Sequence, residues 1–352
     1  MSRTKSSLNG FSFDIIGQIV TQLVLLYLIP QYIVLSSAEL YGLWLTINSL
    51  IGWMSIADIG IGMALGRKLI YATTQKNNNP DFDKDYATSI STALFSFAIS
   101  AVVILLVGSL FIAYALTTFK INPTNYIEFK QTFFIALIAA SLSLPLSVFP
   151  AIVETHLKLS FIRITGTITG LCGHAVGFTL LWLGYGIKSL AIGILCGILL
   201  NALANFIYSK KLSGYSIGVQ YFSFSEFKSL FAFGGYFQLG RIANTVAVST
   251  DNIVISMLIN PASVASYSFT AKLSQLFGII IASKIPISLL PGITQCFAEG
   301  NKTKLQEIHS SLNQNVQNIN SSIQNSATPS TTVTELPAVN PTKPIDDGTN
   351  KS

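Results

Sequence analysis

The stretch ISTALFSFAISAVVILLVGSLFIAYAL (Ile90–Leu116) carries no charged side chain along its whole length. About 20 apolar residues in an α-helix cross the hydrocarbon core of a bilayer, so this stretch predicts a transmembrane helix. The whole chain agrees, because 50% of its 352 residues are hydrophobic and only 10% are charged. Such long apolar runs exclude a β-barrel, whose strands alternate polar and apolar residues over about ten positions. We therefore expect an all-α, polytopic transmembrane bundle.

Similar apolar runs recur along the chain and predict eight membrane-spanning helices. The runs are Phe11–Val34, Tyr41–Leu65, Ile90–Leu116, Phe133–Leu157, Thr167–Gly186, Leu190–Tyr208, Phe231–Ile259 and Ser263–Ile285. The first six form an expected N-terminal lobe, and the last two form a partial C-terminal lobe. In residue ranges, the expected parts are the first lobe (1–208), a polar cytoplasmic connector (209–229) and the partial second lobe (230–300).

The remaining chain changes character after residue 300. Apolar residues recur there at steps of three and four, which predicts an amphipathic cytoplasmic helix over residues 301–326. Residues 327–352 contain too few apolar side chains to fold and are expected to be a disordered tail.

Two segments of the chain resemble each other. SSAELYGLWLTINSL (Ser36–Leu50) is similar to PASVASYSFTAKLSQL (Pro261–Leu276), and each places a tyrosine, Tyr41 or Tyr267, early in a helix. Internal repeats around a shared core are a common plan of transporters. A chance match between two short stretches is the alternative.

The loop charges predict the orientation of the chain in the membrane. One side carries Arg3, Lys5, Arg67, Lys68, Lys76, Lys84, Lys158, Arg163, Lys210, Lys211, Lys228, Lys302 and Lys304. The other side carries Lys120, Lys130 and Lys188. Basic residues concentrate on the cytoplasmic side of membrane proteins, so both termini are expected in the cytoplasm. The first apolar run is too long for a signal peptide and is expected to be retained.

No motif in the chain indicates a cofactor or a metal. The three cysteines match no metal-binding spacing and cannot all pair with one another. No ATP-binding signature occurs, and no basic run interleaved with aromatic residues indicates nucleic acid.

Two basic residues lie near the middle of predicted spans and indicate a polar path. By helical rise, Arg241 and Lys272 are both near the midplane, where a charge is costly unless it faces water or a partner. Gln238 and Asn244 share the face of Arg241, and Gln275 shares that of Lys272. These residues form a candidate cationic wall for a pyrophosphate or an acidic sugar. The alternative is an internal ion pair, such as Arg241 with Asp251 or Asp58.

Acidic residues and a histidine are candidates for coupling transport to protons or ions. They are Asp58, Asp14, Glu154, His174 and Asp251. Intramembrane carboxylates and histidines form the proton relays of transporters. Structural roles are the alternatives: Asp14 is close to a helix start, His174 can bond a carbonyl, and Asp58 can satisfy the backbone at an irregularity near Gly60. Gly166 and Gly170 are expected to let two helices pack closely.

Three stretches carry a resemblance to a known family. They are AELYGLWLTINSLIGWMSIADIGIGMALGRKLI (Ala38–Ile70), FAFGGYFQLGRIANTVAVSTDNIVISMLI (Phe231–Ile259) and SVASYSFTAKLSQLF (Ser263–Phe277). Together they resemble the Wzx-type O-antigen and polysaccharide flippases of the multidrug/oligosaccharidyl-lipid/polysaccharide exporter superfamily. The resemblance implies a two-lobed bundle of six plus six helices with a central cavity. Because only two helices of the second lobe follow, a C-terminally truncated or inactive form is the alternative to a complete flippase.

The resemblance implies a function in the bacterial inner membrane. Such proteins pass an undecaprenyl-pyrophosphate-linked oligosaccharide, an O-antigen or capsule repeat unit, from the inner to the outer leaflet. The expected partners are this lipid-linked oligosaccharide, membrane lipids and other polysaccharide-assembly membrane proteins. The alternatives are an ion-coupled multidrug exporter and a non-transporting interaction protein. An enzyme is not expected, because no large loop with acidic residues is present.

Overall fold

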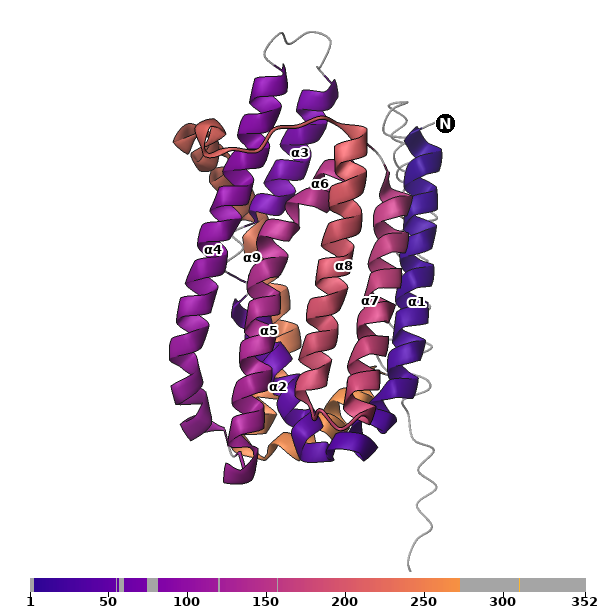
Figure 1. Ribbon diagram of the computed structural model, residues 1–352, viewed down its shortest axis with the longest axis vertical. Helices are drawn as coiled ribbons and strands as arrows, with labels where there is room; N and C mark the ends of the chain where they lie inside the picture. Colours follow the sequence, from indigo (N-terminus) through magenta and orange to yellow (C-terminus); the bar gives the residue numbers. More distant parts are fainter. Residues whose placement is uncertain are drawn as a thin grey trace, which may run out of the picture. The chain divides into compact units, whose positions relative to one another are not determined.

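The structure, a computed structural model, describes residues 3–54, 56, 60–74, 82–119, 121–156, 158–272 and 310. These residues are helical almost throughout, and no strand occurs among them. In chain order the helices are α1 (Arg3–Ser36), α2 (Ala38–Met54), α3 (Ile61–Thr74), α4 (Phe82–Thr118), η3 (Pro123–Asn125), α5 (Tyr126–Leu146), α6 (Val148–Thr155), α7 (Leu159–Trp182), α8 (Lys188–Leu212), η4 (Val219–Tyr221), α9 (Phe224–Leu258) and a last helical segment, residues 261–272. The expected all-α bundle is confirmed (Figure 1).

The chain divides into two units. The first, Met1–Ser283, is compact and holds all of these helices. The second, Lys284–Ser352, includes Ser310 as its described residue. The predicted helix over residues 301–326, apart from Ser310, and the predicted tail over 327–352 lie outside the described residues. The division into an N-terminal and a partial C-terminal lobe stays a prediction.

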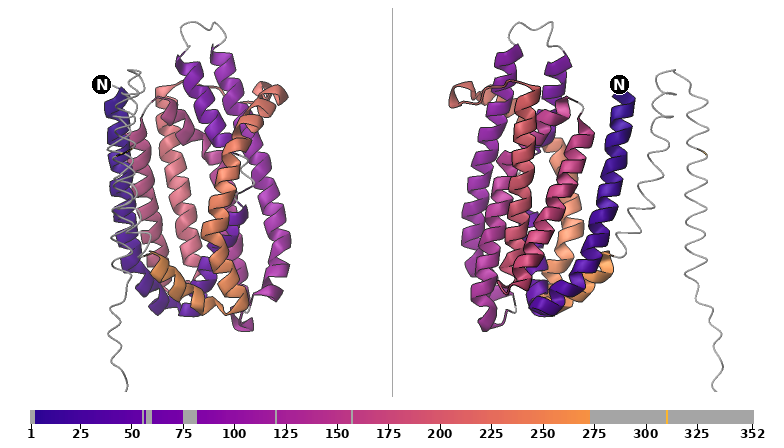
Figure 2. Two further views of the ribbon diagram at one scale, coloured as in Figure 1. Left: turned by 180° about the vertical axis from the view of Figure 1, so that it is seen from behind. Right: turned by 45° about the vertical axis from the view of Figure 1, so that its right-hand side comes forward.

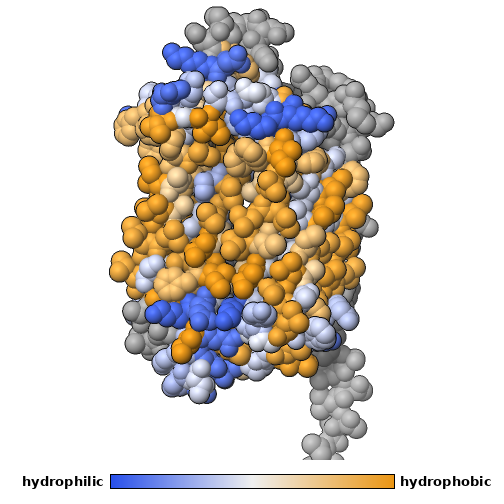
Figure 3. Space-filling model, in the orientation of Figure 1, coloured by the Kyte–Doolittle hydropathy of each residue, from blue (hydrophilic) through white to orange (hydrophobic). Residues whose placement is uncertain are grey.

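Five of the described helical stretches are long and apolar enough to cross a membrane. They are Ser12–Ser36, Phe82–Ile112, Pro123–Thr155, Leu159–Trp182 and Lys188–Leu212. α4 shows why a membrane is required. Between residues 99 and 110 its exposed side recurs at helical spacing and is apolar except for Ser109; it is formed by Ile99, Val102, Val103, Leu106, Val107 and Leu110. An exposed apolar stripe of this extent is a lipid-facing surface. Figure 3 shows an apolar band on one face, between two polar ends.

The second predicted span, Tyr41–Leu65, is not one helix but two. α2 ends at Met54, and α3 begins at Ile61 after Gly60, whose φ of +70° lies in the left-handed region. Glycine adopts this conformation without a steric penalty. A side chain at Gly60 would also overlap the Gly234 carbonyl oxygen of α9. The helix is therefore interrupted where α9 approaches Gly60, which agrees with the irregularity predicted near this residue.

The fourth predicted span, Phe133–Leu157, is also divided. α5 begins earlier, at Tyr126, and ends at Leu146, and α6 follows after a turn at Ser147. Pro145 lies in the last turn of α5 and lacks the amide proton that a continuing helix needs. The Ser147 hydroxyl donates to the Leu144 carbonyl oxygen at 2.6 Å. A side chain of the turn thus gives a hydrogen bond to a carbonyl oxygen in the last turn of α5.

The closest helix pair is α7 with α8, which cross at glycines. A Cβ atom at Gly173 would lie 2.6 Å from the Gly193 carbonyl oxygen, and one at Gly193 would lie 2.9 Å from the Gly177 Cα. Added side chains at Gly166 and Gly170, by contrast, meet no described atom within 4 Å. The close packing expected at Gly166 and Gly170 is therefore found one to two turns later, where Gly173 of α7 faces Gly193 of α8.

α9 packs against α2, α3 and α4. Figure 2 shows it running beside α2 and α3. The Ser223 hydroxyl caps its start by accepting from the Glu226 amide at 3.4 Å. The Glu226 carboxylate forms an ion pair with Lys68 of α3 and accepts from the Ser89 hydroxyl of α4 at 2.8 Å. Connector and helix start are thereby joined to α3 and α4.

Candidate functional site

A cavity of about 500 Å³ lies inside the bundle, between helices from both ends of the described chain. Its wall combines α1, α2, α7 and α8 with α9 and the segment 261–272. On α9 the lining runs from Ala247 to Asn252. Because α1, α7 and α8 are membrane-spanning by length and composition, the cavity places polar groups at membrane depth.

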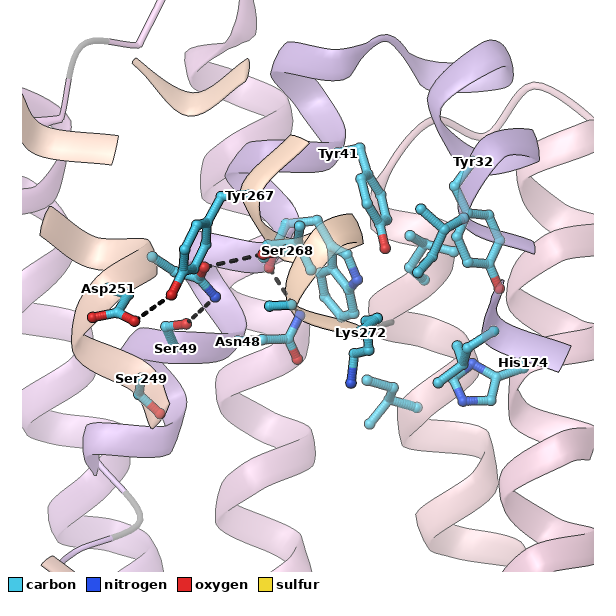
Figure 4. A pocket seen from close by; sticks show the side chains of 18 of the residues that line it. Tyr32, Tyr41, Asn48, Ser49, His174, Ser249, Asp251, Tyr267, Ser268 and Lys272 are labelled. Atoms are coloured by element: carbon cyan, nitrogen blue, oxygen red, sulfur yellow. Dashed lines mark hydrogen bonds between the residues drawn. The ribbon is translucent and has the colours of Figure 1, made fainter. Parts of the chain in front are cut away.

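Lys272 and His174 both line this cavity. Figure 4 shows both side chains pointing into one space, Lys272 from the segment 261–272 and His174 from α7, with Asn48 of α2 nearby. The sequence placed Lys272 in a substrate path and His174 in a coupling role without relating the two. The structure brings them together, so a cationic ammonium group and an imidazole face the same ligand-sized space.

A hydrogen-bond network joins three helices along one side of the cavity. The Asn252 side-chain amide donates to the Ser49 hydroxyl at 3.0 Å, and the Ser268 hydroxyl donates to the Asn252 oxygen at 3.0 Å. Next to it, the Tyr267 hydroxyl donates to the Asp251 carboxylate. These bonds fix α2, α9 and the segment 261–272 relative to one another, and Figure 4 shows them as dashed lines.

Aromatic side chains form another part of the wall. Tyr32, Tyr41, Trp44 and Tyr267 all line the cavity. The rings of Tyr32 and Tyr41 lie 5.9 Å apart, between centroids. The Tyr32 hydroxyl is buried and has no hydrogen-bond partner among the described residues. Buried polar groups usually have a partner, so this hydroxyl is available to one that enters the cavity.

These aromatic residues were not among those predicted for the site, although one feature of the sequence pointed to them. Tyr41 and Tyr267 occupy matching places in the two similar segments, and in the structure both line one cavity. The segments also meet at their starts, since a side chain at Gly42 would overlap the Pro261 carbonyl oxygen. The internal similarity therefore maps onto the two sides of the cavity.

Arg241 and Gln238, which were expected beside Lys272, do not line the cavity. Arg241 is exposed and lies about 9 Å along the helix axis from Ala247, the first lining residue of α9. Gln238 is buried, and its amide donates to the Ile56 carbonyl oxygen at 2.6 Å. Sequence spacing gives the relative position of these side chains on α9, but not the depth at which the cavity opens.

The remaining candidates are dispersed. Asp251 lines the cavity, whereas Asp14 pairs with Arg163 of α7 at 3.3 Å and accepts from Gln18 at 3.1 Å. Glu154 is exposed near the end of α6. Asp58, Gln275 and the side chain of Asn244 lie outside the described residues. An ion pair of Arg241 with Asp251 does not form within α9, because ten residues of helix separate them by about 15 Å.

No cluster of metal-ligating side chains occurs among the residues that the structure describes. The chemistry of the cavity is that of recognition: one ammonium group, one carboxylate, one imidazole, hydroxyl and amide groups, and aromatic faces. Cavities of this composition bind ligands through a few placed polar groups on a largely apolar wall. Fold and cavity together define a multi-pass membrane protein with an internal polar chamber.

Comparison with known proteins identifies the family. Residues 35–320 match the family described as "Polysaccharide biosynthesis protein". The chain belongs to this polysaccharide biosynthesis protein family, which supports the resemblance to polysaccharide flippases. It is also similar to a protein of Shigella flexneri named "Putative O-antigen transporter", with 23% identity over 248 residues. That match covers 70% of this chain and 56% of the relative, so the chain spans about half the length of the relative. No solved structure matches the chain.

Proposed function

We propose that the protein is a flippase, which moves an undecaprenyl-pyrophosphate-linked oligosaccharide from the inner to the outer leaflet of the bacterial inner membrane. The observation that carries this proposal is the cavity that Lys272 and His174 both line, walled by α1, α2, α7 and α8 on one side and by α9 and residues 261–272 on the other. A site between two sets of helices is suited to alternate exposure.

The chemistry of the wall fits the two parts of such a substrate. The Lys272 ammonium group attracts the pyrophosphate, and a charge in a low-dielectric chamber acts strongly on an anion. The hydroxyl and amide groups of Ser49, Asn48 and Asn252 can bond sugar hydroxyls, and the aromatic faces can stack on sugar rings. Family membership supports a glycan ligand, and the name of the Shigella relative supports transport over catalysis.

The orientation and driving force follow from the sequence. The bias of basic loop residues supports cytoplasmic termini, so that the substrate enters from the side on which it is made. The chain has no ATP-binding signature, and a gradient or the downhill flux of substrate drives the step. A drug exporter would need an anionic pocket for organic cations, whereas this cavity carries the Lys272 ammonium group, and its Asp251 carboxylate is bonded to the Tyr267 hydroxyl.

Complementation tests the proposal. The chain is expressed in a bacterium that lacks its own glycan flippase, and surface polysaccharide is measured with membrane insertion confirmed. We expect the wild-type chain to restore polysaccharide, Lys272→Ala to abolish it and Lys272→Arg to retain part of it. Lys228→Ala is the matched control, since Lys228 is exposed near the start of α9. Insertion without restored polysaccharide would contradict transport by this chain.

A further inference from the structure

A second cavity, of about 290 Å³, lies behind the first within α2, α4, α5 and α8. The two cavities share three lining residues, Trp44, Asn48 and Ile194, and are therefore neighbours across one thin wall. No residue assigned to the path by sequence lines this second cavity. It lies at membrane depth, since its walls on α4, α5 and α8 belong to spans.

The wall of the second cavity is formed mostly by apolar side chains. Ile104, Leu144 and Ile198 supply branched side chains, and Ala139 and Ala140 of α5 leave the space open. Asn48 and Ser143 are polar, but each gives a proton to a carbonyl oxygen of its own helix. The Asn48 amide donates to the Trp44 carbonyl oxygen at 2.8 Å, and the Ser143 hydroxyl donates to the Ala140 carbonyl oxygen at 2.7 Å.

A space of this character at membrane depth favours hydrocarbon over water. Apolar cavities of about 150 Å³ stay dry and bind benzene or xenon, and this one is larger. Water needs two to four polar partners, and most of the residues that line this cavity have apolar side chains. The occupant is therefore apolar, and the shared wall at Trp44 and Asn48 joins it to whatever occupies the polar chamber.

We propose that the second cavity binds the first isoprene units of the carrier lipid while the pyrophosphate lies in the polar chamber. This inference rests on the proposed function. The two cavities thus bind the two parts of a prenyl pyrophosphate. Lys272 and its neighbours bind the anionic head, and the space beside Ala139 and Ala140 binds the adjoining hydrocarbon. The site recognises the carrier that all repeat units share, whatever their sugars.

Binding to the full chain in nanodiscs tests the proposal with three probes: inorganic pyrophosphate, geranyl pyrophosphate and geraniol. Each buried methylene contributes about 0.8 kcal/mol, so geranyl pyrophosphate is expected to bind at least about tenfold tighter than pyrophosphate. Lys272→Ala should weaken both pyrophosphates alike. Ala140→Leu, which fills the cavity, should reduce geranyl pyrophosphate to the affinity of pyrophosphate itself.

The matched control is Ile138→Phe. It adds as many carbon atoms to the same helix as Ala140→Leu, but Ile138 is 42% exposed on the outer face of α5. The control should leave the preference for geranyl pyrophosphate unchanged. As a readout that needs no variant, a diazirine on the geranyl chain should crosslink the wild-type protein on α4 and α5 beside Ile104 and Ala139.

The outcomes separate this inference from the proposed function. Equal affinity for pyrophosphate and geranyl pyrophosphate overturns the apolar site and leaves the polar chamber standing. Crosslinks confined to exposed residues of α4 would also overturn the apolar site. Competition by geraniol as strong as that by geranyl pyrophosphate would overturn it as well, because it indicates a general lipid site. If no pyrophosphate binds and complementation fails, the proposed function and the inference fall together.

Discussion

The Glu226 carboxylate at the start of α9 bonds two earlier helices at once, the Lys68 ammonium group of α3 and the Ser89 hydroxyl of α4. Its side chain is only 12% exposed, whereas that of Lys68 is 40% exposed. The Glu226 carboxylate is thus the more buried member of the pair. It ties the connector and α9 to the helices that precede them by more than a hundred residues.

Glu226→Gln should lower the free energy of unfolding by about 1–2 kcal/mol, because the Lys68 ammonium group loses its ionic partner and the Ser89 hydroxyl loses a charged acceptor. The thermal midpoint of the purified protein in detergent measures the effect. Glu154→Gln is the control, since Glu154 is exposed at the end of α6. Equal midpoints for the two variants would show that the Lys68 pair contributes nothing measurable.

Gly193→Val should separate α7 from α8 and destabilise the protein by about 1–3 kcal/mol or more, since overpacking forces the backbones apart. Gly170→Val provides the comparison. It introduces the same β-branched side chain into a helix, at a position where an added Cβ meets no described atom within 4 Å. Thermal unfolding of both variants checks the prediction, and a larger loss for Gly170→Val would refute the packing described for Gly193.

Gln238→Leu should cost about 1–3 kcal/mol, because the Ile56 carbonyl oxygen loses its donor inside the bundle. Limited proteolysis and thermal unfolding report the loosening of the segment between α2 and α3. Gln220→Leu, an exposed position in η4, is the control and should leave both measurements unchanged. Wild-type stability in Gln238→Leu would mean that the bond from Gln238 to Ile56 does not stabilise the segment between α2 and α3.

Tyr215 should make the stability sensitive to alkaline pH. It lies in the connector outside the spans, where burial raises the pKa of its hydroxyl above the ordinary 10.0. Its hydroxyl shares a 2.8 Å hydrogen bond with Ser209. Because the folded pKa is raised, this contribution is complete below pH 10 and is lost as the pH rises through the folded value.

Tyr215→Phe should therefore flatten the loss of stability above pH 10, which thermal unfolding across an alkaline pH series measures. Tyr185→Phe is the control, since Tyr185 is 56% exposed in the turn between α7 and α8. An unchanged alkaline slope in Tyr215→Phe, or an equal change in Tyr185→Phe, would contradict a role for Tyr215.

Hydropathy alone predicted the fold class, because long apolar runs have few other uses than to cross lipid. It could not place the helix breaks, which depend on tertiary contacts. Gly60 adopts positive φ where Gly234 of α9 approaches, and no local pattern announces a neighbour from so far along the chain. The start of α9 was predictable from Ser223 and Glu226, whose spacing is that of a capping box.

Only some of the residues predicted for the site line the cavity, and their roles stay predictions. Lys272, His174 and Asp251 line the cavity, as charged or titratable groups in a membrane often do. Arg241 does not, although its depth seemed equivalent to that of Lys272. Hydropathy gives the depth of a residue by counting from the ends of a span. The position of the cavity depends instead on how α9 packs against α2, and this packing cannot be predicted from one sequence.

The pairing of α1 with α7 has a consequence for how the chain enters the membrane. Roughly 120 residues separate the end of α1 from the start of α7, and the pair is joined by Asp14 and Arg163. Arg163 follows Asp14 by about 150 residues, so at about 5–20 residues per second of synthesis Asp14 waits between about 7 and 30 s for its counter-ion to emerge from the ribosome. The first helix must spend that interval without its final neighbour, and the insertion machinery is the natural place for it to be sheltered.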